Sequence, residues 1–135
     1  MWTAGDVVDS GYCGDYTTWT LYSDGKLVIS GKGAIYNATP AWDSYNIQIK
    51  SVVIEDGVTN IPNEAFYYYY KNLTSVTFNG ETPISKKMFM SAESISLVVI
   101  KGYDVEIANG AFNGFDDVNS QICCLFNGFV QVPPY

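Results

Sequence analysis

A pattern of about 23 residues, repeated three times between residues 49 and 112, constrains this chain more than any other feature. Each copy opens with six residues in the order apolar-x-x-apolar-x-apolar, passes through an isoleucine, and ends at a phenylalanine preceded by alanine or methionine. The copies are 49–54 with Ile61 and Phe66, 73–78 with Ile84 and Phe89, and 95–100 with Ile107 and Phe112. A fixed period of this length is typical of stacked repeats, because one unit cannot bury its apolar face alone.

The six-residue openings predict short strands, because β-branched residues dominate them. Val52, Val76 and Val98 occupy the same place in successive copies, at steps of 24 and 22 residues. Stacking the units would pair equivalent strands in parallel, about 4.8 Å apart. The sequence therefore predicts a mainly β fold that leans towards α/β, in the form of a short solenoid with a parallel strand ladder.

Upstream of the repeats, the sequence predicts an antiparallel β-hairpin. Two alternating runs, at 17–22 and 26–30, flank the segment Ser23-Asp24-Gly25. An Asp-Gly pair between such runs favours a two-residue type I′ turn. The expected buried face of this hairpin carries Trp19, Leu21, Leu27 and Ile29.

A length of 135 residues favours one domain. Residues 1–15 are polar and Gly-rich, and we expect them to form a loosely held lead-in. Residues 16–48, which include the hairpin, are expected to form an N-terminal cap on the repeats. Within this cap we expect a short helix or turn at 40–45, with Thr39 as its N-cap and Trp42 in the core. Residues 49–117 hold the three repeats. Residues 118–135 are expected to form a degenerate fourth repeat and C-terminal cap, in which Gln121 replaces the central valine.

Composition excludes several kinds of chemistry. The chain has no histidine, which rules out Ser-His-Asp and Cys-His catalysis and histidine metal ligands. Cys13, Cys123 and Cys124 fit neither a zinc site nor an even disulfide framework, so buried free thiols are favoured. Acidic groups such as Glu55-Asp56 match no calcium loop. We therefore expect no metal and no cofactor. The net charge of −7 makes nucleic acid an improbable partner, and no run is long and apolar enough to insert into a membrane. A monomer is the default expectation.

The x positions of the predicted strands should face away from the core. Stacking would place Val53, Thr77 and Val99 in one row, extended to Ile122. Ser51, Ser75 and Leu97 would form the neighbouring row, extended to Ser120. We expect Val53, Thr77, Leu97 and Val99 to contact a binding partner, because repeat proteins bind through such extended faces. The alternative is a solvated sheet, or a face covered by the N-terminal hairpin.

The run Tyr67-Tyr68-Tyr69-Tyr70 is the most unusual local feature of the sequence. Tyr70 stands three residues before the next strand and is expected to point inward. Tyr67, Tyr68 and Tyr69 are then candidates for an exposed rim that contacts a protein or a sugar, since tyrosine is large, stiff and amphipathic. The alternative is that these side chains pack across neighbouring turns.

The segment Ile-x-Ser-Val-Val-Ile-Glu-Asp-Gly-Val-Thr-x-Ile-x-x-x-Ala-Phe at 49–66, followed by Leu-Thr-Ser-Val-Thr-Phe at 73–78, resembles the BspA-like leucine-rich repeats of bacterial surface proteins. The segment 19–31 is similar to a block that often precedes such repeats, so the resemblance covers about residues 11–126. It implies a small right-handed leucine-rich-repeat-like solenoid, a secreted or cell-surface location, and roles in adhesion or protein binding. It supplies no catalytic residue. The family usually has a cysteine after Ala-Phe, where this chain has Tyr70, Ala92 and Phe115.

The expected function is therefore a non-catalytic cell-surface or secreted interaction module that binds a protein or a glycan. Residues 1–10 lack the features of a signal peptide, so either the protein is intracellular or its signal lies outside these 135 residues. Given the resemblance, we presume the second. One alternative is a purely structural spacer that presents other parts of a larger surface protein, and a more remote one is a hydrolase that uses only carboxylates. A contiguous exposed apolar or aromatic patch would favour binding over the spacer.

Overall fold

The structure is a computed structural model that describes residues 5–36, 41–62, 65–66, 70–85, 88, 94–102 and 105–108, with the backbone of 121–124. These residues contain seven strands and one short 3-10 helix. The elements are β1 (Val7–Tyr12), β2 (Thr17–Tyr22), β3 (Lys26–Gly31), η1 (Asp43–Tyr45), β4 (Ser51–Ile54), β5 (Ser75–Phe78), β6 (Leu97–Ile100) and β7 (Gln121–Cys124). The described part of the chain contains no helix with the length and hydropathy required to cross a lipid bilayer.

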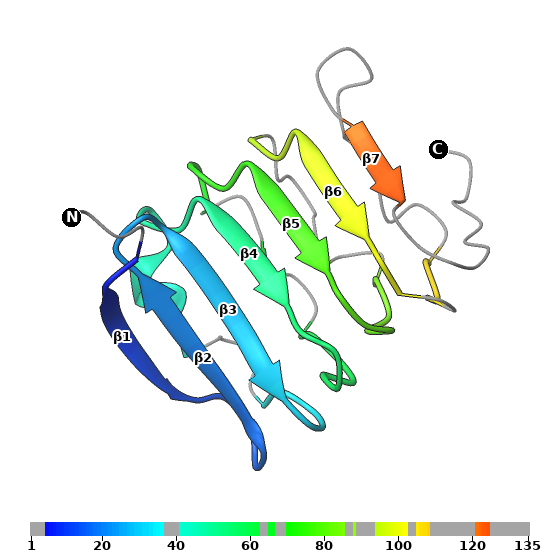
Figure 1. The fold of residues 1–135 in the computed structure, drawn as a ribbon, viewed down its shortest axis with the longest axis horizontal. Helices are drawn as coiled ribbons and strands as arrows, with labels where there is room; N and C mark the ends of the chain where they lie inside the picture. The colour runs from blue at the N-terminus through cyan, green and yellow to red at the C-terminus, as the bar shows by residue number, and fades with distance from the viewer. Residues whose placement is uncertain are drawn as a thin grey trace.

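All seven strands belong to one sheet, in the order of the sequence (Figure 1). β2 is antiparallel to its two neighbours, β1 and β3, and we call these three strands the N-terminal meander. From β3 onward every neighbouring pair is parallel, through β7. The sheet is therefore mainly β and mixed, with β3 as the strand where antiparallel pairing changes to parallel pairing.

The predicted register of the repeats is confirmed. Val52 pairs with Val76, and Val76 pairs with Val98. All three side chains are buried, because the four-residue strands alternate half-buried and buried positions. The prediction for the last strand is wrong by one residue, because Ile122, and not Gln121, stands opposite Val98. The third step, from Val98 to Ile122, is thus 24 residues.

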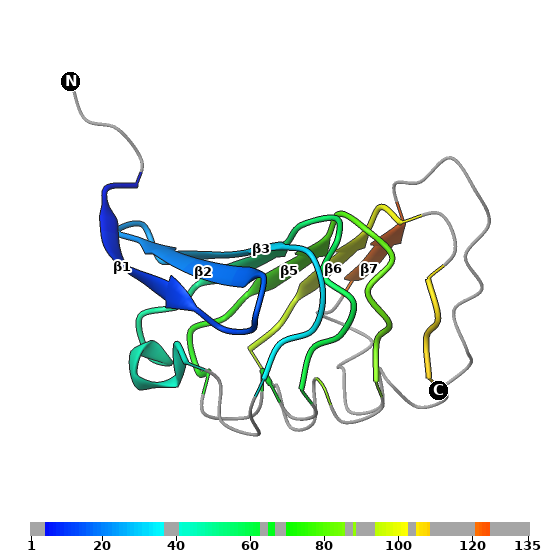
Figure 2. The ribbon, with the colours of Figure 1, turned by 90° about the horizontal axis from the view of Figure 1, so that it is seen from below.

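The connecting segments that the structure describes lie on one side of the sheet, and the core lies between them and the strands (Figure 2). Inward side chains of the strands meet side chains of the returning segments, such as Phe66, Ile84 and Met88, each at most 1% exposed. Successive returns also bond to each other, because Ile84 N–H donates to the Glu106 carbonyl and Ala108 N–H to the Ile84 carbonyl. Each repeat is thus hydrogen-bonded to the next both through its strand and through its returning segment.

The predicted hairpin is confirmed, with Trp19, Leu21, Leu27 and Ile29 buried. Its turn differs from the predicted type. Gly25 N–H donates to the Tyr22 carbonyl, so Ser23 and Asp24 are the central residues, and Gly25 follows with a φ of 88°. This three-residue loop ending in a left-handed glycine places the positive φ where glycine tolerates it.

One expectation for the N-terminal region is wrong, and one of the alternatives for the outer face is excluded. Residues 7–12 are not a loose lead-in but strand β1, which pairs with β2. The hairpin does not fold over the outer face of the repeats; it continues their sheet through β3 and β4. Both differences have one cause: the hairpin has backbone donors and acceptors on each edge, and pairing satisfies more of them than stacking would.

The helix η1 attaches the meander to the first repeat. The Tyr45 hydroxyl donates to Asp9 on β1 at 2.6 Å, and this bond, with that from the Ser10 N–H, lowers the pKa of Asp9. Trp42, just before η1, is fully buried as predicted. Thr39 and Pro40 lie outside the described residues. Cys13 is a buried free thiol, as predicted, whereas the side chains of Cys123 and Cys124 lie outside the described part.

Candidate functional site

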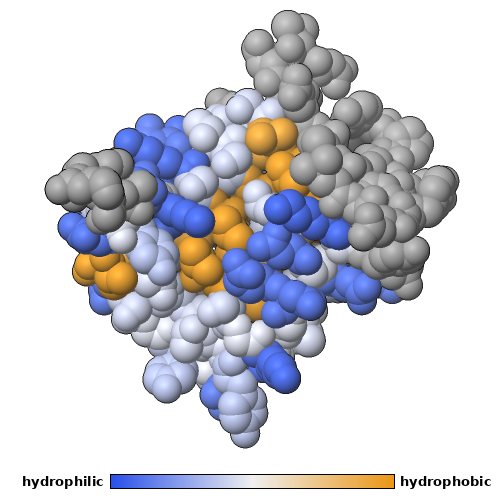
Figure 3. Space-filling view, viewed as in Figure 1, coloured by the Kyte–Doolittle hydropathy of each residue, from blue (hydrophilic) through white to orange (hydrophobic). Residues whose placement is uncertain are grey.

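The sheet has an outer face on the side opposite the described returns (Figure 2). Alternate residues of β2 to β6 point to this outer face, and their side chains are half-buried. They are Thr18, Thr20, Tyr22, Val28, Ser30, Ser51, Val53, Ser75, Thr77, Leu97 and Val99. Figure 3 shows hydrophobic residues grouped across the middle of this face, with hydrophilic residues to either side.

Three of the predicted contact residues form one row. The register places Val53 between Val28 and Thr77, and Thr77 between Val53 and Val99. We call Thr20, Val28, Val53, Thr77 and Val99 the central row; they come from five adjacent strands. Leu97 lies in the neighbouring row opposite Ser75, as predicted. The predicted extension of the two rows into β7 is wrong by one residue. Val99 stands opposite Cys123 instead of Ile122, and Leu97 stands opposite Gln121 instead of Ser120.

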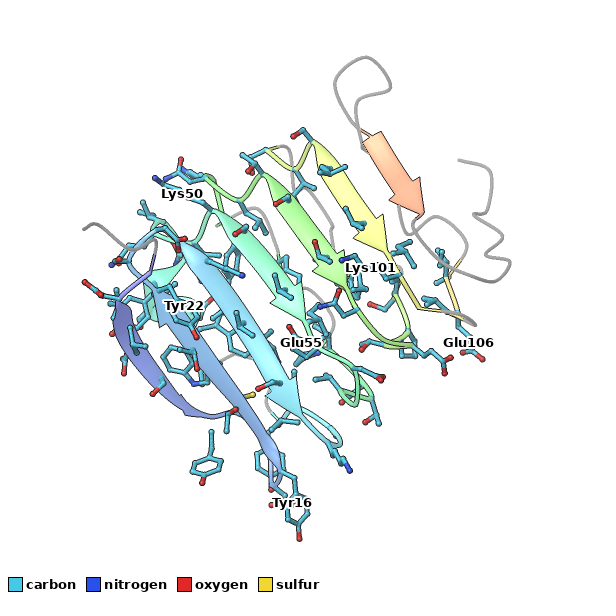
Figure 4. The ribbon with its side chains drawn as sticks, in the orientation of Figure 1. Tyr16, Tyr22, Lys50, Glu55, Lys101 and Glu106 are labelled. Carbon is cyan, nitrogen blue, oxygen red and sulfur yellow. The ribbon has the colours of Figure 1, made fainter. Side chains whose placement is uncertain are left out.

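Polar groups border the central row at the carboxyl ends of the strands. Asn79 follows β5 and donates through Nδ2 to Glu55, which follows β4, at 3.3 Å. Lys101 occupies the equivalent place after β6, and Figure 4 shows Glu55 and Lys101 near the carboxyl ends of β4 and β6. Apolar side chains bordered by polar ones are the usual composition of a protein-binding surface.

A metal centre in the described residues would need several acidic or cysteine side chains close together. No group of three or more acidic or cysteine side chains that could hold a metal ion occurs among the described residues. Glu55 accepts from Asn79, and its neighbour Asp56 is exposed. The flat, regular outer face can bury area against a partner, but it does not enclose a small substrate.

The predicted tyrosine rim falls largely on undescribed residues. Tyr67, Tyr68 and Tyr69 lie outside the described part of the chain. Tyr70 points inward as predicted, and only 2% of its surface is exposed.

A different group of exposed tyrosines, which the sequence did not predict, lies at the end of the meander. Tyr12 ends β1, Tyr16 belongs to the β1–β2 turn, and Tyr36 follows β3. Their exposed fractions are 76%, 78% and 49%, and Figure 4 shows Tyr16 extending beyond the end of the sheet. We call Tyr12, Tyr16, Tyr36 and Asp15 the tyrosine cluster.

Asp15 organises the polar side of this cluster. The Tyr36 hydroxyl donates a hydrogen bond to Asp15. That bond is the main reason why the pKa of Tyr36 is raised, with smaller contributions from desolvation and from the charges of Asp15 and Tyr16. The cluster thus joins aromatic rings to a carboxylate at one exposed corner.

The fold resembles that of a known structure, although sequence comparison gave no match: neither a protein-family model nor a curated protein matches this chain. The crystal structure of a leucine-rich repeat protein from Eubacterium ventriosum superimposes with a TM-score of 0.53 over 90% of this chain, at 22% sequence identity. The chain has a leucine-rich-repeat-like fold.

This leucine-rich-repeat-like chain corresponds to only 27% of the length of that protein. At 22% identity the likeness extends to the fold and does not carry a ligand or an activity with it. The outer face and the tyrosine cluster are therefore the features that bear on function.

Proposed function

We propose that this chain is a non-catalytic interaction module of a secreted or cell-surface protein, and that it binds a protein partner through the outer face of its sheet. The central row is the observation that carries the proposal. Its half-buried side chains are mainly valine and threonine, and their strands are fixed in register by neighbours on both sides. A surface ordered before binding loses little conformational entropy when a partner docks.

The outer face also has the arrangement of a binding surface. Hydrophobic residues meet in its middle, and Glu55, Asn79 and Lys101 form a polar border at one side. A uniformly polar face would instead favour the alternative function, a structural spacer within a longer repeat protein. The hydrophobic middle of the face is the reason we prefer binding.

We extend the proposal to the solenoid form, the domain organisation and the location of the protein. Parallel pairing of strands in front and of returns behind supports a short solenoid that forms one domain with the meander as its N-terminal cap. The BspA-like motif at 49–66 supports a bacterial surface protein with a role in adhesion. A secreted or surface location belongs to this proposal.

The test introduces a charge into the central row. Thr77→Glu places a carboxylate between Val53 and Val99, where a docked partner would have to desolvate it. Thr59→Glu makes the same change at an exposed residue in the first return and is the matched control. Wild type is first screened against purified extracellular-matrix proteins, and the dissociation constant of the best binder is then measured for both variants.

We expect Thr77→Glu to weaken binding by about tenfold or more, as at a well-packed contact, while Thr59→Glu binds like wild type. Both variants should keep the wild-type melting temperature within a few degrees, since both positions are outside the core. Equal affinity of the two variants, or no binding by wild type to any protein of the panel, would contradict binding through this face.

A further inference from the structure

We propose that the tyrosine cluster is a second binding site, and that its ligand is a neutral oligosaccharide. This site lies at the far end of the meander and uses none of the residues of the central row. The inference therefore goes beyond the proposed protein-binding face and stands or falls independently of it.

The cluster is built from three segments that the fold holds together. Cys13 N–H donates to the Thr17 carbonyl at 3.0 Å, and Tyr36 N–H donates to the Cys13 carbonyl at 2.7 Å. Lys32 N–H donates to the Tyr16 carbonyl at 3.0 Å. These bonds tie the β1–β2 turn to the segment after β3, so the backbone that carries the tyrosines is ordered before a ligand arrives.

The close fit of this corner supports the same conclusion. A Cβ on Gly14 would lie 2.1 Å from the Ala34 carbonyl oxygen, and a Cβ on Gly31 would lie 2.1 Å from the Tyr16 carbonyl oxygen. Glycine is therefore required at both places for the turn to lie against the chain that follows β3. The two exposed rings of Tyr12 and Tyr16 project from a rigid base.

The chemistry of the cluster matches a sugar. A pyranose ring has an apolar face of C–H groups, which packs on an aromatic ring, and a rim of hydroxyls, which need acceptors. Tyr12 and Tyr16 supply exposed rings, and Asp15, held by Tyr36, supplies carboxylate oxygens at the exposed corner. Tyrosine hydroxyls add further donors and acceptors.

Charge excludes several other occupants. Asp15 and the net charge of −7 repel phosphate groups, which disfavours nucleic acid even though bases stack on tyrosine. A quaternary ammonium ion is bound by aromatic rings that enclose it. Tyr12 and Tyr16 are too open to form such a cage, at 76% and 78% exposure. Open, exposed rings instead fit a neutral sugar, which can stack on the face of one ring at a time.

Size argues against a protein as the ligand of this corner. A stable protein interface takes roughly 20–30 residues from each side, whereas the cluster consists of three tyrosines and one aspartate. An oligosaccharide presents one ring at a time and can use so small a site. Repetition of the sugar along a polysaccharide would then raise the overall affinity through repeated encounters.

The experiment uses isothermal titration calorimetry of the full chain with neutral hexasaccharides: cellohexaose, xylohexaose, mannohexaose, maltohexaose and chitohexaose. The variants are Tyr16→Ala, the double variant Tyr12→Ala with Tyr16→Ala, and Tyr16→Phe. Ile47→Ala is the matched control, because Ile47 is 64% exposed and lies in the segment after η1, outside the cluster.

We expect wild type to bind at least one hexasaccharide with a weak but measurable affinity. Loss of one stacked ring should weaken binding roughly three- to tenfold, and the double variant should weaken it further. Tyr16→Phe keeps the ring and should bind nearly as wild type, and Ile47→Ala should be unchanged. Because both tyrosines are largely exposed, the variants should keep the wild-type circular dichroism spectrum.

Three results would overturn the proposal: no binding of any hexasaccharide, binding unaffected by the double variant, or displacement of the sugar by tetramethylammonium ions. Introducing Thr77→Glu separates the two proposals. This variant should leave hexasaccharide binding intact even where it abolishes protein binding. The tyrosine variants should weaken hexasaccharide binding and leave protein binding intact.

Discussion

At the scale of single residues, Tyr70 joins the core of the first repeat to η1. Its ring is buried and meets Phe66 edge-on, with ring centroids 5.9 Å apart. Its hydroxyl donates to Asp43 of η1 at 3.0 Å. A buried hydroxyl needs such a partner. The hydroxyl of Tyr70 therefore ties the first repeat to η1.

This bond predicts how stability depends on pH. Burial first, and then the Asp43 carboxylate, raises the pKa of Tyr70 above its ordinary value of 10.0. In the unfolded chain the phenol ionises near that value, while the folded chain keeps its proton. Stability from this group is thus complete below about pH 10 and declines as pH rises above it.

Tyr70→Phe should lower the free energy of unfolding at pH 7 by about 1–2 kcal/mol, because Asp43 loses its donor. The same variant should lose less stability than wild type between pH 10 and pH 11, measured by urea unfolding. Tyr12→Phe, which alters an exposed hydroxyl, is the control and should follow wild type. Parallel pH curves for wild type and Tyr70→Phe would show that Tyr70 does not keep its proton in the fold.

At the scale of elements, the strands with strong local signals were predicted correctly. β4, β5 and β6 are buried on one side and flanked by neighbours, so β-branched residues and alternation fix both their existence and their register. β1 was not predicted, because it is an edge strand with only one neighbouring strand. Its Val7 and Val8 are 59% and 46% exposed, so no buried face imposes a pattern on its sequence.

The turns after the strands contain a feature that periodicity alone did not reveal. Gly80 follows β5 and Gly102 follows β6, and the two are stacked: a Cβ on Gly102 would lie 2.0 Å from the Gly80 carbonyl oxygen. The same Cβ would lie 2.6 Å from Val105 Cγ2. Glycine is needed here because the backbone of the preceding turn approaches too closely for any side chain.

Gly102→Ala should therefore destabilise the chain by about 1–3 kcal/mol, the usual cost of overpacking. At an unconstrained glycine, replacement by alanine usually raises the free energy of unfolding. A decrease at Gly102 would therefore indicate close packing of the turns. Lys101→Ala, at the exposed neighbouring residue, is the control and should change stability by no more than about 0.5 kcal/mol. A Gly102→Ala variant as stable as wild type in urea would mean that the turns are not stacked so closely.

At the scale of the whole molecule, the outer face could be predicted from the sequence and the tyrosine cluster could not. Val53, Thr77 and Val99 recur at the repeat period, so their alignment follows from the period alone. Tyr12 and Tyr36 are far apart in sequence, and two backbone hydrogen bonds between their segments bring them together. One signal was available: aromatic residues just beyond strand ends are exposed unless the chain returns over them.

The continuous sheet leads to a final prediction, that the meander and the repeats unfold together. β3 pairs with β2 on one side and β4 on the other, and Leu27 stands beside Val52 across that junction. Both residues belong to the same buried cluster. The chain has three tryptophans, at positions 2, 19 and 42. Trp19 and Trp42 are buried, so changes in their fluorescence report on the meander and the segment that follows it, whereas circular dichroism reports on the whole sheet. Since one core joins the two parts, the two signals should give a single urea midpoint.

Leu27→Ala removes side-chain volume at this junction and should cost about 2–5 kcal/mol. If the meander and the repeats form one cooperative unit, fluorescence and circular dichroism must shift together, because the cavity weakens both sides of the β3–β4 pair. If they were independent units, fluorescence would shift to lower urea while most of the circular dichroism signal kept its wild-type midpoint. Two separated transitions in the variant would place the boundary of a cooperative unit at β3, and the change from antiparallel to parallel pairing would then divide the sheet energetically as well as in topology.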